Sequence, residues 1–271
     1  MNATSIEWCD FSVNPIRAQR LDGGERIPGH FCEKISAGCK NCYASKLQSR
    51  FGMLPFLAEN RGKVFFVFDS KALHAVRSRK KPARIFWCDM TDIFLRPVQN
   101  DAVHACFQAM MDTPQHTHLV LTKRPNEALA FFQRMDWPSL PPHIHFGVSL
   151  EDQETADQRI PVLLQIRAAV RWVSYEPALG PVDFNDSRDW LTPVLTKPKN
   201  AARLDWVVCG GESGGGARPM HPDWARSVRD QCVSAGVPFF FKQWGGVRKK
   251  KAGRLLDGRE WNEYPSTRTI S

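Results

Sequence analysis

Short apolar runs that alternate with helical patterns are the feature of this sequence that most restricts its fold. The six runs, rich in β-branched and aromatic residues, occupy residues 84–88, 117–122, 144–149, 170–174, 205–211 and 237–244. Near-continuous apolar runs suit strands buried on both faces, and helices between them favour a parallel sheet. The chain has 271 residues, enough for a large core. We predict an α/β fold: a partial or distorted parallel (β/α) barrel of about six or more strands.

One intervening segment, residues 221–236, has a clear helical pattern. Pro222 suits its first turn, Gly236 can end it, and apolar residues recur every four positions on one face. Cys232 lies in that apolar stripe, which predicts core packing rather than ligation. Residues 185–203 are polar and broken by prolines, so we predict a functional loop or an insertion there.

The balance of charge and the cysteine content restrict the class of protein. The formal net charge of +9 favours a polyanionic partner, although a solvated charged face is an equal alternative for either basic cluster. The clusters comprise Arg77, Arg79, Lys80, Lys81 and Arg84, and Arg248, Lys249, Lys250, Lys251 and Arg254. No apolar run of about 20 residues and no signal peptide are present, so we expect a cytoplasmic protein without a membrane partner. In that setting, eight cysteines favour metal or cofactor ligation over disulfides.

Polar residues follow each of the six predicted strands. They include Asp89, Thr91, Asp92, Lys123, Arg124, Ser149, Glu151, Glu176, Gly210, Gly211, Glu212, Lys242 and Gln243. Any strand must leave the core through polar residues, but the C-terminal ends of parallel barrel strands meet at one mouth. We therefore predict a ligand site there. The glycine-rich stretch 209–220 could cradle an anion with Arg218 as its charge partner, or it could be a simple strand-to-helix turn.

Three cysteines lie close together in residues 28–45, which we call the cysteine loop. Cys32, Cys39 and Cys42 have the spacing C-x6-C-x2-C, and no fourth cysteine is near. Three thiolates suit an iron–sulfur cluster with one open iron, or a zinc ion completed by His30 or water. Free structural thiols are the third possibility. The spacing alone leaves these alternatives open.

The sequence resembles the phage-associated three-cysteine radical-SAM-like family, long filed as a domain of unknown function. The resemblance covers most of residues 4–246 and keeps the motifs in order. They are "SIEWCDFSVNP", "KISAGCKNCYA", "FWCDMTDIF", "PQHTHLVLTKRP", "FGVSLEDQETADQRIPVLL", "SYEPALGP", "GGESGGGARPMHPDWARSVRDQC" and "VPFFFKQWG". Many members pass from the Asn-Pro almost directly to the first cysteine, whereas here residues 16–31 intervene.

This resemblance implies a barrel of the radical-SAM type over residues 1–247, followed by a basic C-terminal tail over 248–271. It implies that Cys32, Cys39 and Cys42 hold a [4Fe-4S] cluster whose open iron binds S-adenosylmethionine (SAM). The residues expected to contact the cofactor are Asp89, Thr91, Asp92, Ser149, Glu151, Gly210, Gly211, Glu212 and Arg218. Those expected to act on the substrate are Lys123, Arg124, Glu176, Lys242 and Gln243.

Phage association and the basic charge point to DNA, or a nucleotide-linked group, as the substrate, as in the hypermodification of thymine. Binding through the two basic clusters would then depend steeply on salt. The cytoplasm would be that of a phage-infected or prophage-carrying bacterium, and an external donor such as flavodoxin or ferredoxin would supply electrons. Two alternatives remain open. One is a radical SAM enzyme that acts on a free small molecule or peptide; the other is a zinc-stabilised nucleic-acid-binding protein.

Overall fold

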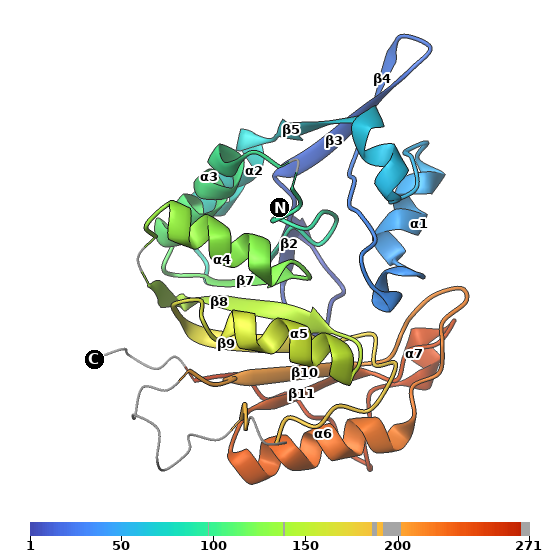
Figure 1. The fold of residues 1–271 in the computed structure, drawn as a ribbon, viewed down its shortest axis with the longest axis vertical. Helices are drawn as coiled ribbons and strands as arrows, with labels where there is room; N and C mark the ends of the chain where they lie inside the picture. Colours follow the sequence, from blue (N-terminus) through green and yellow to red (C-terminus); the bar gives the residue numbers. More distant parts are fainter. Residues whose placement is uncertain (97, 138, 186–188, 192–201, 267–271) are drawn as a thin grey trace.

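An eight-stranded sheet is the centre of the fold. Figure 1 shows the computed structural model of the chain, which describes residues 1–271 except 97, 138, 186–188, 192–201 and 267–271. The strand order is β1-β2-β6-β7-β8-β9-β10-β11, parallel from β2 to β11, with β1 antiparallel to β2. The strands are β1 (Asn2–Ala3), β2 (Phe11–Val13), β6 (Arg84–Trp87), β7 (Thr117–Thr122), β8 (Leu140–Leu150), β9 (Ala168–Tyr175), β10 (Trp206–Gly210) and β11 (Phe239–Gln243).

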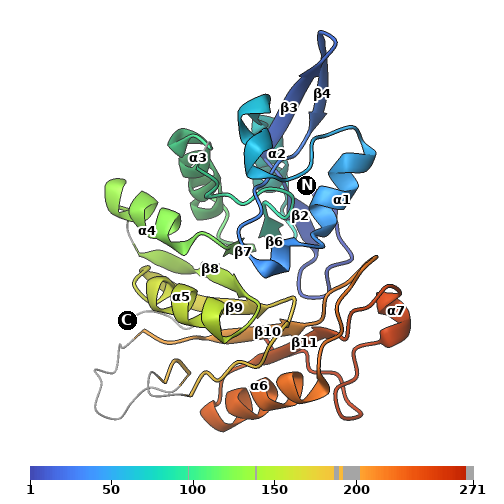
Figure 2. The same cartoon turned by 45° about the vertical axis from the view of Figure 1, so that its right-hand side comes forward.

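This sheet curls into a half-barrel, as Figures 1 and 2 show from two directions. All six predicted apolar runs form strands, from β6 to β11. The predicted mixed α/β class and the parallel, partial barrel are therefore confirmed at this level. That the barrel is of the radical-SAM type stays a prediction.

Helices cover the convex face of the half-barrel. They are α2 (Ser70–Ser78), α3 (Asn100–Met111), α4 (Pro125–Arg134), α5 (Gln153–Leu163) and α6 (Pro222–Ala235). The predicted helix over 221–236 is confirmed, because α6 starts at Pro222 and Gly236 ends it in the left-handed region at φ 64°. Cys232 is fully buried in the helix-side core, as its position in the apolar stripe predicts.

The concave face holds a second, smaller core. Its buried members are Trp8, Cys9, Phe86, Leu119, Trp172, Trp206, Val208 and Phe240. Trp8 comes from the segment between β1 and β2, and its ring centroid lies 4.7 Å from Phe86 and 5.2 Å from Trp172. These aromatic side chains form the floor of the half-barrel. We call this group the aromatic floor.

A separate three-stranded sheet, in the order β4-β3-β5, stands beside the half-barrel. It consists of β3 (Ile16–Asp22), β4 (Glu25–Gly29) and β5 (Val64–Phe68), all antiparallel. The intervening residues 16–31 thus form the hairpin that projects at the top of Figure 1. Its inner face packs through Ile16 and Ala18, which are buried. The cysteine loop follows this hairpin and continues into the short helix η1 (Ala37–Cys39) and α1 (Tyr43–Arg50).

Several other parts of the chain bear on the predictions. Most of the predicted loop over 185–203 lies outside the described residues. The division into residues 1–247 and a tail over 248–271 stays a prediction; within the latter, α7 (Lys249–Ala252) forms and Asn262 bridges to Phe240 of β11. The remaining short helix is η2 (Ala58–Lys63). None of the described helices combines the length and apolar character needed to cross a bilayer.

Candidate functional site

A cavity of about 520 Å³ lies on the concave side, at the C-terminal ends of the strands. This volume is within the range of small-molecule sites, roughly 300–1,000 Å³. The predicted residues that line it are Cys32, Cys39, Cys42, Asp89, Thr91, Asp92, Lys123, Arg124, Ser149, Glu176, Glu212 and Lys242. Those outside its lining are Glu151, Gly210, Gly211, Arg218 and Gln243. The strand ends therefore do converge on one mouth.

The cysteine loop forms one wall of the cavity. Cys39 ends the turn of η1, with its Sγ 3.8 Å from Ser36 Oγ, and Cys42 is the residue that precedes α1. Burial raises the pKa of the Cys42 thiol, and hydrogen bonds from the backbone N–H groups of Ser45 and Ala44 offset only part of that rise.

Cys32 lies deeper in the same wall. Burial, with a smaller contribution from the Asp92 carboxylate, raises the pKa of its thiol to about 12 despite the opposing charge of Arg124. The thiol is therefore protonated at neutral pH, and a metal ion would have to displace its proton in order to bind. Among the described residues, no three His, Cys, Asp or Glu side chains converge closely enough to hold a single metal ion. An iron–sulfur cluster would require a different arrangement, because each thiolate binds its own iron.

His30, the predicted fourth ligand of a zinc ion, points elsewhere. It is buried, its Nδ1 lies 3.2 Å from the carbonyl oxygen of Ile16, and it is not among the residues that line the cavity. The three thiols line the cavity together with carboxylates, and His30 does not join them. A zinc site completed by this histidine is therefore not formed among the described residues.

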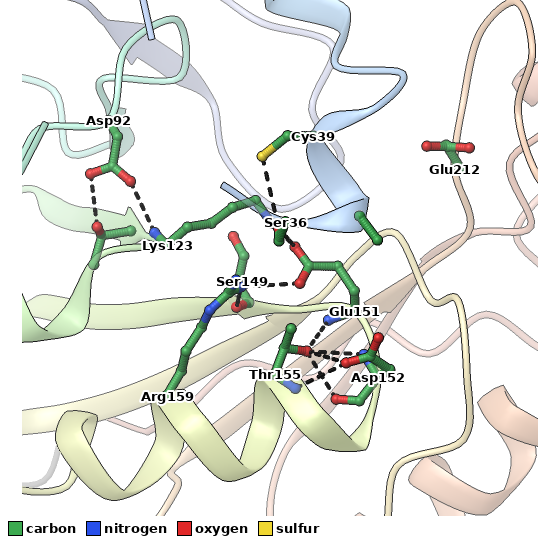
Figure 3. A network of polar contacts seen from close by, with 12 residues as sticks. Ser36, Cys39, Asp92, Lys123, Ser149, Glu151, Asp152, Thr155, Arg159 and Glu212 are labelled. Carbon is green, nitrogen blue, oxygen red and sulfur yellow. Dashed lines mark hydrogen bonds and ion pairs between the residues drawn. The ribbon is translucent and has the colours of Figure 1, made fainter. Parts of the chain in front are cut away.

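Glu151 anchors the cysteine loop from below (Figure 3). Its carboxylate is fully buried and accepts hydrogen bonds from Ser36 Oγ at 2.9 Å and Arg159 Nη1 at 3.1 Å, and it pairs with Lys123. Burial raises the pKa of Glu151, but Lys123 and Arg159 outweigh it and lower the pKa. A Cβ on Gly38 would lie 2.5 Å from this carboxylate, so the loop can approach only as glycine.

Asp92 and Arg124 make a second anchor. Asp92 accepts hydrogen bonds from Thr122 Oγ1 at 2.7 Å and from the backbone N–H of Lys123 at 2.9 Å, and it pairs with Arg124 at 3.3 Å. Arg124 in turn donates to the carbonyl oxygen of Glu33 at 3.0 Å. The strand-end residues of β6 and β7 thus fasten the start of the cysteine loop.

The glycine-rich turn after β10 makes the third anchor. Glu212 accepts hydrogen bonds from Arg218 Nε and from Asn41 Nδ2, both at 2.9 Å, and Arg218 also donates to Ala37 O. Burial raises the pKa of Glu212, but these bonds and the charge of Arg218 lower it to about 2. A Cβ on Gly211 would fall on the carbonyl oxygen of Trp244, which explains this glycine. The turn therefore contacts the cysteine loop rather than leaving Arg218 free.

Asp89, which follows β6, is held in place by two side-chain hydrogen bonds. Asn14 Nδ2 donates to Asp89 at 2.6 Å and Tyr43 OH donates to it at 2.8 Å. Asp89 still lines the cavity, beside Thr91, whose buried hydroxyl has no hydrogen-bond partner among the described residues. Thr91 is thus a polar group that a ligand could satisfy.

The cavity's far wall carries an ion pair that holds no part of the loop. Lys242 Nζ lies 2.7 and 2.9 Å from the two carboxylate oxygens of Glu176. Ser149 and Ser174 line the space between this pair and the cysteine wall. Such a pair can donate and accept protons or bind charged substrate groups. Gln243, by contrast, is buried away from the cavity, and its side-chain amide has no partner among the described residues.

The sequence reading did not single out Ser36, Asn41, Arg159, Asn14 or Trp8 for the site. Two signals could have found some of them. Asn14 directly follows β2, so the rule that polar residues at strand ends meet at the mouth applies to it as well. Ser36 precedes Cys39 by one helical turn, which is typical of a residue that caps a short helix.

Comparisons with known proteins add one finding. A family model described as "Protein of unknown function (DUF5131)" matches residues 3–265. Searches among curated proteins and among solved structures each found no significant match. The match spans the half-barrel, the cysteine loop and all three anchors.

Proposed function

We propose that this chain, which belongs to the family of unknown function DUF5131, is a radical SAM enzyme that acts on DNA or on a nucleotide-linked group. The observation that carries this proposal is the shared cavity. Three thiols from one loop line a single space together with polar residues from the ends of β6 to β11. The choice of DNA as the substrate follows from the phage association of the family that the sequence resembles.

The residues that line the cavity support this proposal. Cys32, Cys39 and Cys42 would hold three irons, and the remaining volume faces Asp89, Thr91 and Ser149. A [4Fe-4S] cluster held there would supply the electron for the reductive cleavage of SAM, with flavodoxin or ferredoxin as the external electron donor.

The chain's own residues would position and shelter these groups. The anchors at Glu151, Asp92 and Glu212 hold the cysteine loop against the mouth. The aromatic floor closes the cavity from beneath. Asp89 and Thr91 are suited to an ammonium and a polar group of the co-substrate, respectively, while Glu176 and Lys242 face the remaining space and would contact the substrate.

Anaerobic purification with iron and sulfide analysis tests the proposal. We expect a brown protein with about four irons per chain that forms 5′-deoxyadenosine from SAM and a reductant. Cys39→Ser should lose iron and product. Cys232→Ala is the matched control, because this cysteine is buried in α6 and is not among the residues that line the cavity, and it should keep both.

Two outcomes would contradict the proposal. The first is a colourless protein that contains zinc, which supports the nucleic-acid-binding alternative. The second is a protein that holds iron but forms no 5′-deoxyadenosine with or without DNA. If the product forms equally in both conditions, the substrate is a free small molecule or peptide rather than DNA.

A further inference from the structure

The carboxylates that line the cavity are mostly neutralised by residues of the protein itself. Four of the five have a cation partner: Glu33 with Arg61, Asp92 with Arg124, Glu176 with Lys242 and Glu212 with Arg218. The fifth, Asp89, accepts hydrogen bonds from Asn14 and Tyr43. The acidic residues at the mouth therefore leave little charge to oppose a polyanion.

Four exposed cations lie in the cysteine loop, in α1 and around α7. They are Lys40 and Lys46, from the cysteine loop and α1, and Arg248 and Lys251, from the start of α7. Within the described part of the chain, none of these four has an ion-pair partner. We call them the basic arc.

Contacts across the glycine-rich turn join the two ends of the arc. Lys46 Nζ donates to the carbonyl oxygen of Gly215, and Ser213 forms a β-bridge with Gly246, two residues before Arg248. In Figures 1 and 2, α1 and α7 lie on the same side of the molecule. Both ends of the arc therefore lie near the cavity, since Asn41 and Ser213 line it.

The basic cluster over residues 77–84 is different. Arg77 pairs with Asp112 at 2.9 Å and Arg84 pairs with Asp10 at 2.9 Å. The Arg79 guanidinium lies 4.2 Å from the ring centroid of Phe11. These arginines already have partners within the fold, and the cluster precedes β6 at the end of the sheet opposite to the mouth. It is a structural feature of that end.

We infer that the basic arc binds the phosphate backbone of a nucleic-acid strand and directs one of its bases into the cavity. This inference rests on the proposed function and identifies the surface of the protein on which the nucleic acid would bind. Phosphates need cations that are not already paired, and the arc supplies them beside the mouth. Tyr43, at the mouth, is 51 % exposed and offers a ring on which a base can stack.

The cavity below the arc favours nucleic acid over an acidic protein. Its floor includes Trp8 and Phe86, and its walls include the hydroxyls of Thr91, Ser149 and Ser174. A flipped base has an apolar ring face and a polar edge, which such a space can accept. An acidic protein would engage the arc but leave this space unused.

Fluorescence anisotropy with a labelled single-stranded oligonucleotide tests the inference on the full-length protein. Lys40→Gln/Lys251→Gln removes two cations of the arc. Lys80→Gln/Lys81→Gln removes two exposed cations of the other cluster and is the matched control. We expect the arc variant to bind roughly tenfold more weakly and to lose about 1.4 from the slope of log K against log salt concentration. The control should bind as the wild type does.

Equal losses in both variants, or no salt-dependent binding by the wild type, would overturn the inference. It would also be overturned if the arc variant loses binding to purified flavodoxin while oligonucleotide binding is unchanged. The measurement needs neither cluster nor SAM. If the arc variant binds the oligonucleotide normally and the protein forms 5′-deoxyadenosine, the docking surface is rejected and the proposed cofactor chemistry is retained. If the arc variant loses binding but the protein forms no 5′-deoxyadenosine, the cofactor chemistry alone is rejected.

Discussion

The aromatic floor and the polar mouth are built by the same strands, two residues apart. Side chains alternate along a strand, so residues i and i+2 point to the same face. On the concave face, Trp172 is followed by Ser174 and Phe240 by Lys242; likewise, Leu121 is followed by Lys123. One step along each strand replaces a large apolar group by a small or charged one.

This difference explains why there is a cavity at all. The floor is filled by interlocking rings, with Trp172 and Trp206 only 5.1 Å apart between centroids. At the mouth, serine and glycine leave the volume that aromatic side chains fill below. Charged residues there are paired with each other or with the cysteine loop. The packed aromatic floor stabilises the fold, and this stability allows the mouth to remain an open site.

The largest effect should come from emptying the floor. Trp172→Ala removes a fully buried indole, and we expect a loss of about 3–5 kcal/mol in the free energy of unfolding. Ser174→Ala, one step toward the mouth, should cost less than about 1 kcal/mol. Urea titration of both variants measures the difference. Comparable losses would show that floor and mouth are not energetically distinct.

Next in size is the anchor under the cysteine loop. Glu151→Gln keeps the shape of the side chain but leaves Lys123 and Arg159 without their carboxylate, so we expect a loss of about 2–4 kcal/mol. Because Ser36 also loses its charged acceptor, Cys39 in the metal-free protein should react faster with a thiol reagent.

Glu154→Gln, in the first turn of α5 and three residues beyond Glu151, is the control, because this residue is exposed and should change neither quantity by a measurable amount. An unchanged rate of thiol modification in Glu151→Gln, alongside lower stability, would mean that Glu151 supports the sheet but does not position the loop.

The anchor at Glu212 should depend on pH. The folded-state pKa of about 2 is below the ordinary value of 4.5, so its contribution to stability is present above about pH 4.5 and disappears as the pH falls toward 2. Glu212→Gln should therefore cost about 1–3 kcal/mol at pH 7 and progressively less in acid. Denaturation of both proteins at pH 7, 4 and 3 measures this. A constant difference across that range would exclude the carboxylate as its origin.

The smallest effect on stability should come from Ser149. This side chain lines the cavity, and its hydroxyl makes no hydrogen bond to the described residues, so Ser149→Ala should change the free energy of unfolding by less than about 0.5 kcal/mol. If the mouth serves a ligand, however, 5′-deoxyadenosine formation should fall severalfold. Unchanged product formation would remove Ser149 from the binding surface.

Much of the fold could be predicted from local patterns. The apolar runs identified β6 to β11, and Pro222 and Gly236 marked the ends of α6. The small sheet was missed because β3 and β4 alternate exposed and buried residues only weakly and carry several charges. The third strand, β5, pairs with β3 from more than thirty residues further along the chain.

The candidate site was predictable as a place but not as a set of roles. The polar residues at the strand ends located the mouth. The family resemblance placed the three cysteines near this mouth. It could not distinguish a ligand group from an anchor. Glu151 is satisfied by Ser36 and Glu212 by Asn41, partners 115 and 171 residues away in the sequence.

The sequence by itself determined the parallel half-barrel, because hydrophobic periodicity is a local property that each strand and helix carries alone. It also determined that polar groups and three thiols would be available at one end. Only the tertiary structure decided which charges are consumed in holding the cysteine loop and which face the cavity or the solvent. The physical reason is that a buried charge takes whichever partner the fold brings within hydrogen-bonding distance, and that partner can lie anywhere along the chain.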